Sequence, residues 1–333
     1  MGWVAGVDRF QQRHSWAGFP LAVVYKFADD QGGFLVALIT YFGFLSLFPL
    51  LLLLVTVLGF ALEGNPELRQ HVLDSALGQF PIIGTQLANN VHSLRGSVPA
   101  IVVGVVGLLY GVLGIGQAAQ YALNRAWAVP RNERPNPLLA RARSALLVLV
   151  FAAGVLATTV LSGVGSAADS YGARVGVGLR VGLLVASVVV DLALFVVAFR
   201  LLTARDVTLR DLLPGAVLAA IAWQGLQSGG ALYVGHTLKR TTDIYGLFGL
   251  VLGLLAWIYL EATVVVLSSE INVVRACRLW PRSLLTPFSD DVSLTSADKR
   301  AYTSYAQMRR HKRDEEINVS FEGPPGKKRP DRS

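Results

Sequence analysis

Three carboxylates lie inside long apolar runs and are the first residues of this sequence with a capacity for chemistry. Asp191 lies near the middle of one run, Glu261 lies past the middle of another, and Glu270 lies near the end of that second run. An ionised carboxylate at the centre of a bilayer costs roughly 2.5–3.5 kcal/mol on insertion scales, so each is expected to face protein or water. Such acids serve proton or ion pathways, or they hold helices together.

Helical spacing separates the polar residues of the last run. Glu261 and Asn272 are 11 residues apart and therefore lie only about 20° apart around a helix that turns ~100° per residue. Glu270 points to the opposite face. We expect it to pair with Arg275 or Arg278 at the membrane edge and to have a structural role.

Two glutamines, Gln224 and Gln227, add polarity to the middle of the preceding run. Together with Asp191 and Glu261 they form a candidate polar pathway through the protein. The alternative is that these groups form interhelical hydrogen bonds worth about 0.6 kcal/mol each. The sequence leaves both interpretations open.

Other site chemistry is missing from the sequence. Cys277 is the single cysteine, and the five histidines form no pair with metal-ligand spacing. No phosphate-binding glycine loop and no nucleophile grouping is present. We therefore predict no catalytic residues, no metal, no cofactor, no enzymatic activity and no nucleic-acid partner.

The composition is that of a membrane protein, because 53% of the 333 residues are hydrophobic, 16% are charged and the mean hydropathy is +0.49. A soluble domain has roughly 25% charged residues. Six apolar runs reach the ~20 helical residues that span a bilayer, and lipid cannot satisfy a non-helical backbone. The predicted fold class is an all-α polytopic protein with six transmembrane helices. The runs are Phe34 to Leu62, Val98 to Ala119, Ser144 to Val164, Val181 to Leu202, Leu212 to Val234, and Gly246 to Ile271.

Charge placement orients these spans. Alternate connections and the two termini carry 24 Lys and Arg on one side and 6 on the other, so both termini are predicted to be cytoplasmic. Residues 1–33 are expected to be a cytoplasmic amphipathic segment, 34–275 the transmembrane domain, and 276–333 a basic, largely disordered tail that contacts anionic lipid headgroups.

Three further patterns concern packing and surface placement. The connection from Glu63 to Ser97 alternates apolar and polar residues, which predicts short amphipathic helices at the outer interface, with a plain surface loop as the alternative. Gly107 and Gly111 form a GxxxG pair, which favours close packing within the bundle, with a homo-oligomer interface as the alternative. Pro49 interrupts a first span longer than a bilayer requires and predicts a kink or tilt.

Several phrases in this order resemble the YihY/BrkB family of bacterial inner-membrane proteins, most of all its YhjD-like branch. The match runs from about Val23 to Pro281. Its phrases are Phe44 to Leu50, Gln117 to Trp127, Asp211 to Ala216, and Tyr245 to Asn272.

The resemblance implies a bacterial plasma-membrane protein, and it marks Pro49, Asn124, Trp127, Pro214, Glu270 and Asn272 as structural or family-motif residues. Members have carried the name ribonuclease BN, a label regarded as mistaken. The leading hypothesis is a transporter-like or flippase-like protein for a lipid, a lipid precursor or a small solute, without its own ATPase. The alternative is a cell-envelope scaffold that does not transport but binds partners.

Overall fold

The computed structural model describes residues 2–61, 98–170, 177–233, 239–286 and 292–321, and the regular structure of this part of the chain is entirely helical. The predicted amphipathic helices between Glu63 and Ser97 lie outside these residues. The helices are α1 (Gly2–Arg13), α2 (Ser15–Asp29), α3 (Gly32–Ala61), α6 (Val98–Ala126), α7 (Pro137–Ser170), α8 (Val177–Leu202), α9 (Leu209–Tyr233), α10 (Lys239–Cys277) and α11 (Ser296–Gln307), with a short 3₁₀ turn at Arg131–Glu133.

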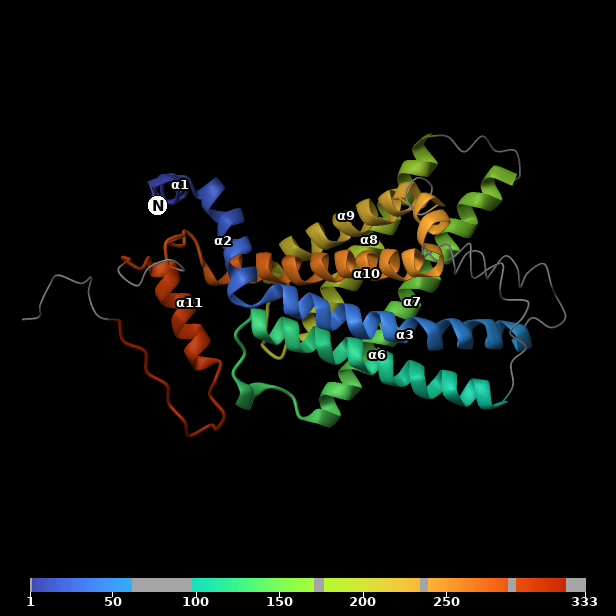
Figure 1. Ribbon diagram of the computed structural model, residues 1–333, viewed down its shortest axis with the longest axis horizontal. Helices are drawn as coiled ribbons and strands as arrows, with labels where there is room; N and C mark the ends of the chain where they lie inside the picture. Colours follow the sequence, from blue (N-terminus) through green and yellow to red (C-terminus); the bar gives the residue numbers. More distant parts are fainter. Residues whose placement is uncertain (1, 62–97, 171–176, 234–238, 287–291, 322–333) are drawn as a thin grey trace, which may run out of the picture.

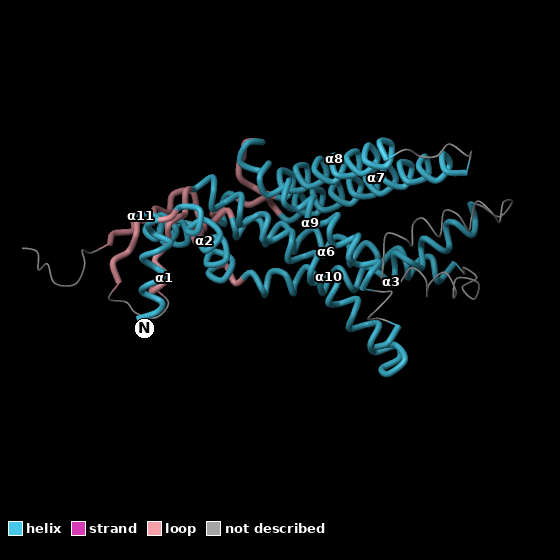
Figure 2. Tube along the Cα trace, turned by 90° about the horizontal axis from the view of Figure 1, so that it is seen from above, coloured by secondary structure: helices cyan, strands magenta, loops and turns pink. Residues whose placement is uncertain are grey.

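The six long helices pack in a closed ring that follows chain order. Helix α3 packs on α6, α6 on α7, α7 on α8, α8 on α9 and α9 on α10, and α10 returns to α3. Both views show the two terminal helices α1 and α2 together with α11 at one end of this bundle, which we call the α11 end (Figures 1 and 2). Helix α6 also contacts α8 and α10 across the ring, so it is the most central of the six helices.

The outer surface of the ring is apolar. Large hydrophobic side chains are exposed on consecutive turns of several helices, including Val106 on α6, Leu149 on α7, Leu184 on α8 and Ile221 on α9. A soluble protein rarely exposes so continuous an apolar surface, whereas lipid tails cover it without cost. The described helices are therefore suited to a membrane.

Three helical segments are long and apolar enough to cross a bilayer: Gly104–Ala126, Val181–Leu202 and Val251–Cys277. A fourth is added if α2 and the start of α3, which are bent by 66° relative to each other, form one broken span. The all-helical membrane fold is thus confirmed among the described residues, and the count of six spans stays a prediction.

The bend between α2 and α3 has a local cause. Gln31 has a φ of 57°, in the left-handed region that interrupts a helix. Gly32 follows, and a Cβ there would lie 2.3 Å from the ring of Phe27, so only glycine permits this approach. This bend separates α2 from α3 and turns the N-terminal segment away from the direction of α3.

The basic tail contains a helix that our prediction of a largely disordered segment did not include. Thr295 accepts a hydrogen bond from the backbone N–H of Asp298, and the Asp298 carboxylate accepts one from the Thr295 amide, which is a reciprocal capping box. One face of α11 is buried at Ala297, Asp298 and Ala301. The sequence Thr295-Ser296-Ala297-Asp298 carried this signal before a run whose overall polarity suggested disorder.

Candidate functional site

A central cavity of about 400 Å³ lies inside the ring, and all six long helices contribute to its wall. Side chains such as Leu47, Phe151 and Leu254 make the lining predominantly aliphatic and aromatic. This volume falls within the range of small-molecule sites, roughly 300–1,000 Å³. Ligand sites are typically concave and mostly apolar, as this half-open cavity is, so it is the leading candidate site.

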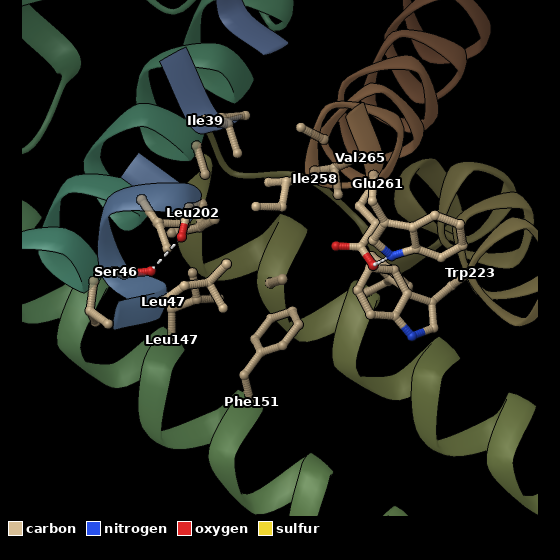
Figure 3. Close-up of a pocket in the computed structure, with 18 of the residues that line it drawn as sticks. Ile39, Ser46, Leu47, Leu147, Phe151, Leu202, Trp223, Ile258, Glu261 and Val265 are labelled. Carbon is tan, nitrogen blue, oxygen red and sulfur yellow. Dashed lines mark hydrogen bonds between the residues drawn. The ribbon is translucent and has the colours of Figure 1, made fainter. Parts of the chain in front are cut away.

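Few polar side chains reach this cavity. Ser46, Gln227 and Glu261 are among its lining residues, and the hydroxyl of Ser46 donates to the carbonyl of Gly43. The indole N–H of Trp257 donates to Glu261 Oε1 at 2.8 Å, one helical turn away on α10. The structure thus brings two of the predicted pathway residues, Gln227 and Glu261, to one cavity, and Figure 3 shows Glu261 in its wall.

The other two predicted pathway residues form a pair of their own. Asp191 on α8 is buried, and its Oδ2 accepts a hydrogen bond of 2.7 Å from Gln224 on α9. Neither residue is part of the cavity lining. This pair joins two neighbouring helices, which is the structural alternative that the sequence left open for these residues.

Beyond the cavity, at the α11 end, Lys26 forms a fully buried ion cluster. Its ammonium contacts Asp30, donates to the carbonyl of Ala126 at 2.9 Å and lies 3.3 Å from Glu270 Oε2. The centre of the Tyr305 ring, on α11, lies 5.5 Å from the same ammonium. Two carboxylates therefore share one cation at a site without solvent exposure.

This cluster corrects the partner that we expected for Glu270. The described ion pair is with Lys26 of α2, 244 positions earlier in the sequence, rather than with Arg275 or Arg278. Arg275 instead donates to the carbonyl of Arg210. Helix α10 packs against α2, so the turn of α10 that carries Glu270 faces protein from another part of the chain.

Arg282 forms a second buried cluster beside the first. Its guanidinium donates to Asp298 at 2.5 Å and to Asp29 at 3.0 Å, and Gln11 donates to its backbone carbonyl. Burial by itself lowers the pKa of Arg282, but the hydrogen bond and charge of Asp298 and the charge of Asp29 outweigh it and hold the pKa above its usual range. The cluster ties α1, α2 and α11 together.

Sequence reasoning missed both clusters. Lys26 and Asp30 were readable as an i, i+4 pair on one helix, and Asp298 was readable as a capping residue. No local pattern indicated that Arg282 meets Asp29, because those residues are 253 positions apart.

The family-motif residues gather at helix contacts. The backbone N–H of Gly215, next to Pro214 in α9, donates to Asn272 Oδ1 of α10 at 2.7 Å. A Cβ on Gly215 would lie 2.1 Å from the carbonyl oxygen of Ser268, so α9 and α10 touch through their backbones here. Two of the resembling phrases therefore meet in space.

Three other motif residues also serve packing. Asn124 accepts from the backbone N–H of Ala204 at 2.7 Å and donates to Leu202 at the end of α8. Trp127 is buried in the core of this end, and Pro49 lies against Gly107 of α6. The motif residues thus form contacts between helices, both around the ring and across it from α6 to α8.

A metal centre is not formed by the described residues, among which no group of three His, Cys, Asp or Glu side chains is arranged to hold an ion. The described lining of the cavity can offer a ligand apolar contacts, a carboxyl group and an amide.

The apolar exterior, the helical ring and the spanning segments define a helical membrane protein. The sequence model described as virulence factor BrkB matches residues 23–286, and the chain belongs to this family. No solved structure matches the chain.

Two of the three relatives described next are named as membrane proteins. The chain is 26% identical over 250 residues to the ribonuclease-like protein YfkH of Bacillus subtilis, covering 71% of this chain and 87% of the relative. It is 26% identical over 297 residues to a UPF0761 membrane protein of Xanthomonas campestris, covering 84% and 66%, so it spans about two thirds of that relative. A UPF0761 membrane protein of Pseudoalteromonas translucida is 25% identical over 262 residues, covering 77% and 85%. The family has no known enzymatic role, and the ribonuclease-like name is a copied misnomer.

Proposed function

We propose that this protein is a plasma-membrane carrier of an apolar or amphipathic molecule, such as a lipid, a lipid precursor or a small organic solute. The observation that supports the proposal is the central cavity, which lies within helices suited to a membrane and takes its wall from all six of them. A retained cavity with few polar groups is what a binding site for an apolar ligand requires.

The proposed arrangement has six spans with both termini in the cytoplasm, as the charge asymmetry predicts. In that orientation the α11 end is cytoplasmic. The Lys26 cluster then closes the cytoplasmic end of the cavity, because Glu270 lies five residues beyond the lining residue Val265, about 7.5 Å along α10 at ~1.5 Å per residue. Neither an ATPase nor a nuclease is part of this proposal.

A cysteine-accessibility experiment tests the carrier function without knowledge of the substrate. Cys277 is replaced by Ser, and single cysteines are placed at the cavity residues Leu47 and Val265. A membrane-impermeant maleimide is then applied to each side of reconstituted vesicles. A carrier is expected to label at these positions from at least one side, because a transport pathway opens to water. Leu149, which is 67% exposed on the outer surface of α7, is the matched control and is expected to stay unlabelled.

A scaffold is the second candidate, and the folded unit at the α11 end favours it. Helices α1, α2 and α11 are fixed there by the Arg282 cluster and present a defined surface at one end of the bundle. A scaffold needs no accessible cavity, so absence of labelling at Leu47 and Val265 from both sides would reject the carrier and leave this second function.

A further inference from the structure

Among the described residues, only one of the two carboxylate oxygens of Glu261 has a hydrogen-bond partner. Glu261 Oε1 accepts from the Trp257 indole, and Figure 3 shows the other carboxylate oxygen directed toward the middle of the cavity. Within the described part of the chain, hydrogen bonding from Trp257 is the only interaction recorded for this carboxyl group, and no basic side chain pairs with it. An ionised carboxylate in apolar surroundings is costly unless it is paired.

We propose that the cavity binds an organic cation, namely a protonated amine on an apolar body, with its ammonium group at Glu261. The proposal rests on the carrier function and specifies its substrate class. An ammonium supplies both the missing charge and a hydrogen-bond donor for the free carboxylate oxygen. The indole of Trp223 lies beside Glu261 on the same wall, and aromatic faces attract cations within about 6 Å.

The rest of the cavity defines the body of the ligand. Away from Glu261 the wall is formed by residues such as Leu47, Phe151 and Leu254, which accommodate hydrocarbon or an aromatic ring. Ser46 is already satisfied within its own helix. A volume of about 400 Å³ holds a compact organic molecule.

The same lining argues against an anion. Among the described residues that line the cavity there is no Lys, Arg or His, and two buried cations outside the lining, Lys26 and Arg282, are already paired with carboxylates. A phosphate or carboxylate headgroup placed here would face the carboxyl group of Glu261 without a counter-ion. A neutral alcohol fits the shape but leaves the charge of Glu261 unpaired.

Three probes with one body and different heads test this inference on the full chain in lipid nanodiscs. They are 4-phenylbutylamine, which is protonated at pH 7, 4-phenylbutanol and 4-phenylbutyrate. Binding is measured by isothermal titration calorimetry after subtraction of empty nanodiscs. We expect the amine to bind about tenfold or more tighter than the alcohol, and the carboxylate to bind weakest, because only the amine forms a charge-assisted hydrogen bond.

Three variants assign the preference to a residue. E261Q is expected to reduce the amine-to-alcohol ratio to about one while alcohol binding is retained. D191N removes the other mid-helix acid, which lies outside the cavity lining, and is expected to keep the wild-type ratio. L47W fills the cavity and is expected to abolish binding of all three probes.

The outcomes separate this inference from the carrier function. Equal affinity for amine and alcohol in the wild-type protein, or an amine preference that survives E261Q, overturns the organic-cation assignment even if L47W still abolishes binding. In that case the cavity remains a ligand site of another class. Absence of any binding sensitive to L47W overturns the assignment as well, and the carrier function is then decided by the cysteine labelling. The wild-type comparison of three probes stands even if E261Q fails to fold.

Discussion

Replacing Lys26 with Met removes the only cation from a buried cluster that holds two carboxylates. Lys26 is 1% exposed, and its ammonium contacts both Asp30 and Glu270. At 3.3 Å and an effective dielectric of about 20, one such contact corresponds to about 5 kcal/mol of Coulomb energy before desolvation is subtracted. Removing one partner of a buried pair typically costs about 3–5 kcal/mol, because the remaining charge is left unpaired.

Substitution of the partner residue, Glu270→Gln, is expected to cost less stability. It leaves Lys26 paired with Asp30 and hydrogen-bonded to the carbonyl of Ala126. The cluster then contains one cation and one anion, so only one of the two ion contacts is lost, and the expected cost lies below the about 3–5 kcal/mol of K26M. The double variant K26M/E270Q is expected to be more stable than K26M alone, because it removes one of the two uncompensated charges.

Thermal unfolding in detergent measures these effects, with apparent midpoints compared at one scan rate. For a large domain, 1 kcal/mol shifts the midpoint by roughly 2–4 °C, so K26M is expected to lose about 6 °C or more. K26M at the wild-type midpoint, or a double variant that shows the full sum of the two single losses, would refute the buried cluster. Energetic coupling between the two positions is the specific signature.

Four other outcomes follow from the contacts and the sequence. Gly215→Ala is expected to lower stability because its Cβ would lie 2.1 Å from a backbone oxygen, whereas Gly225→Ala, with nothing within 4 Å, is expected to be tolerated in the same melting assay. Asp298→Ala is expected to release α11, so that limited proteolysis shortens the protein from its C-terminus; an unchanged pattern would contradict the Arg282 cluster. With Cys277 replaced, a cysteine at Ser97 is expected to react with an external maleimide in intact cells and one at Ser293 is not; the reverse would invert the topology. Protein free of host nucleases is expected to leave RNA intact, and cleavage abolished by one substitution in this chain would overturn that expectation.

The helices were predictable because lipid imposes a strong constraint on the backbone. All six apolar runs fall in helices where the structure describes them. The helices extend beyond the runs, as at α10, which begins at Lys239 rather than Gly246, since backbone hydrogen bonding continues into polar sequence. Hydropathy indicates how much of a helix faces lipid, but it does not indicate the residue at which the helix begins or ends. The order of the helices around the ring could not be predicted, because it depends on tertiary contacts that the apolar runs do not indicate.

The polar residues show why helical periodicity identifies a face but not its neighbour. Trp257 and Glu261 are four residues apart on α10, so they share a face, and the two side chains are hydrogen-bonded. The same reasoning paired Glu270 with nearby arginines, because sequence distance was the only guide to a partner. Its actual partner, Lys26, reaches it through the packing of α2 on α10.

The tertiary structure divides the three intramembrane acids by what faces them. Glu270 has a cation and is sealed from solvent, which suits a structural closure. Asp191 has an amide from a neighbouring helix, which suits a helix contact. Glu261 has an indole on one oxygen and the cavity in front of the other. Three acids of one chemical type thus acquire different capacities from their surroundings alone, and only the acid that reaches open volume without a protein cation is placed to exchange a proton or to bind a ligand's charge.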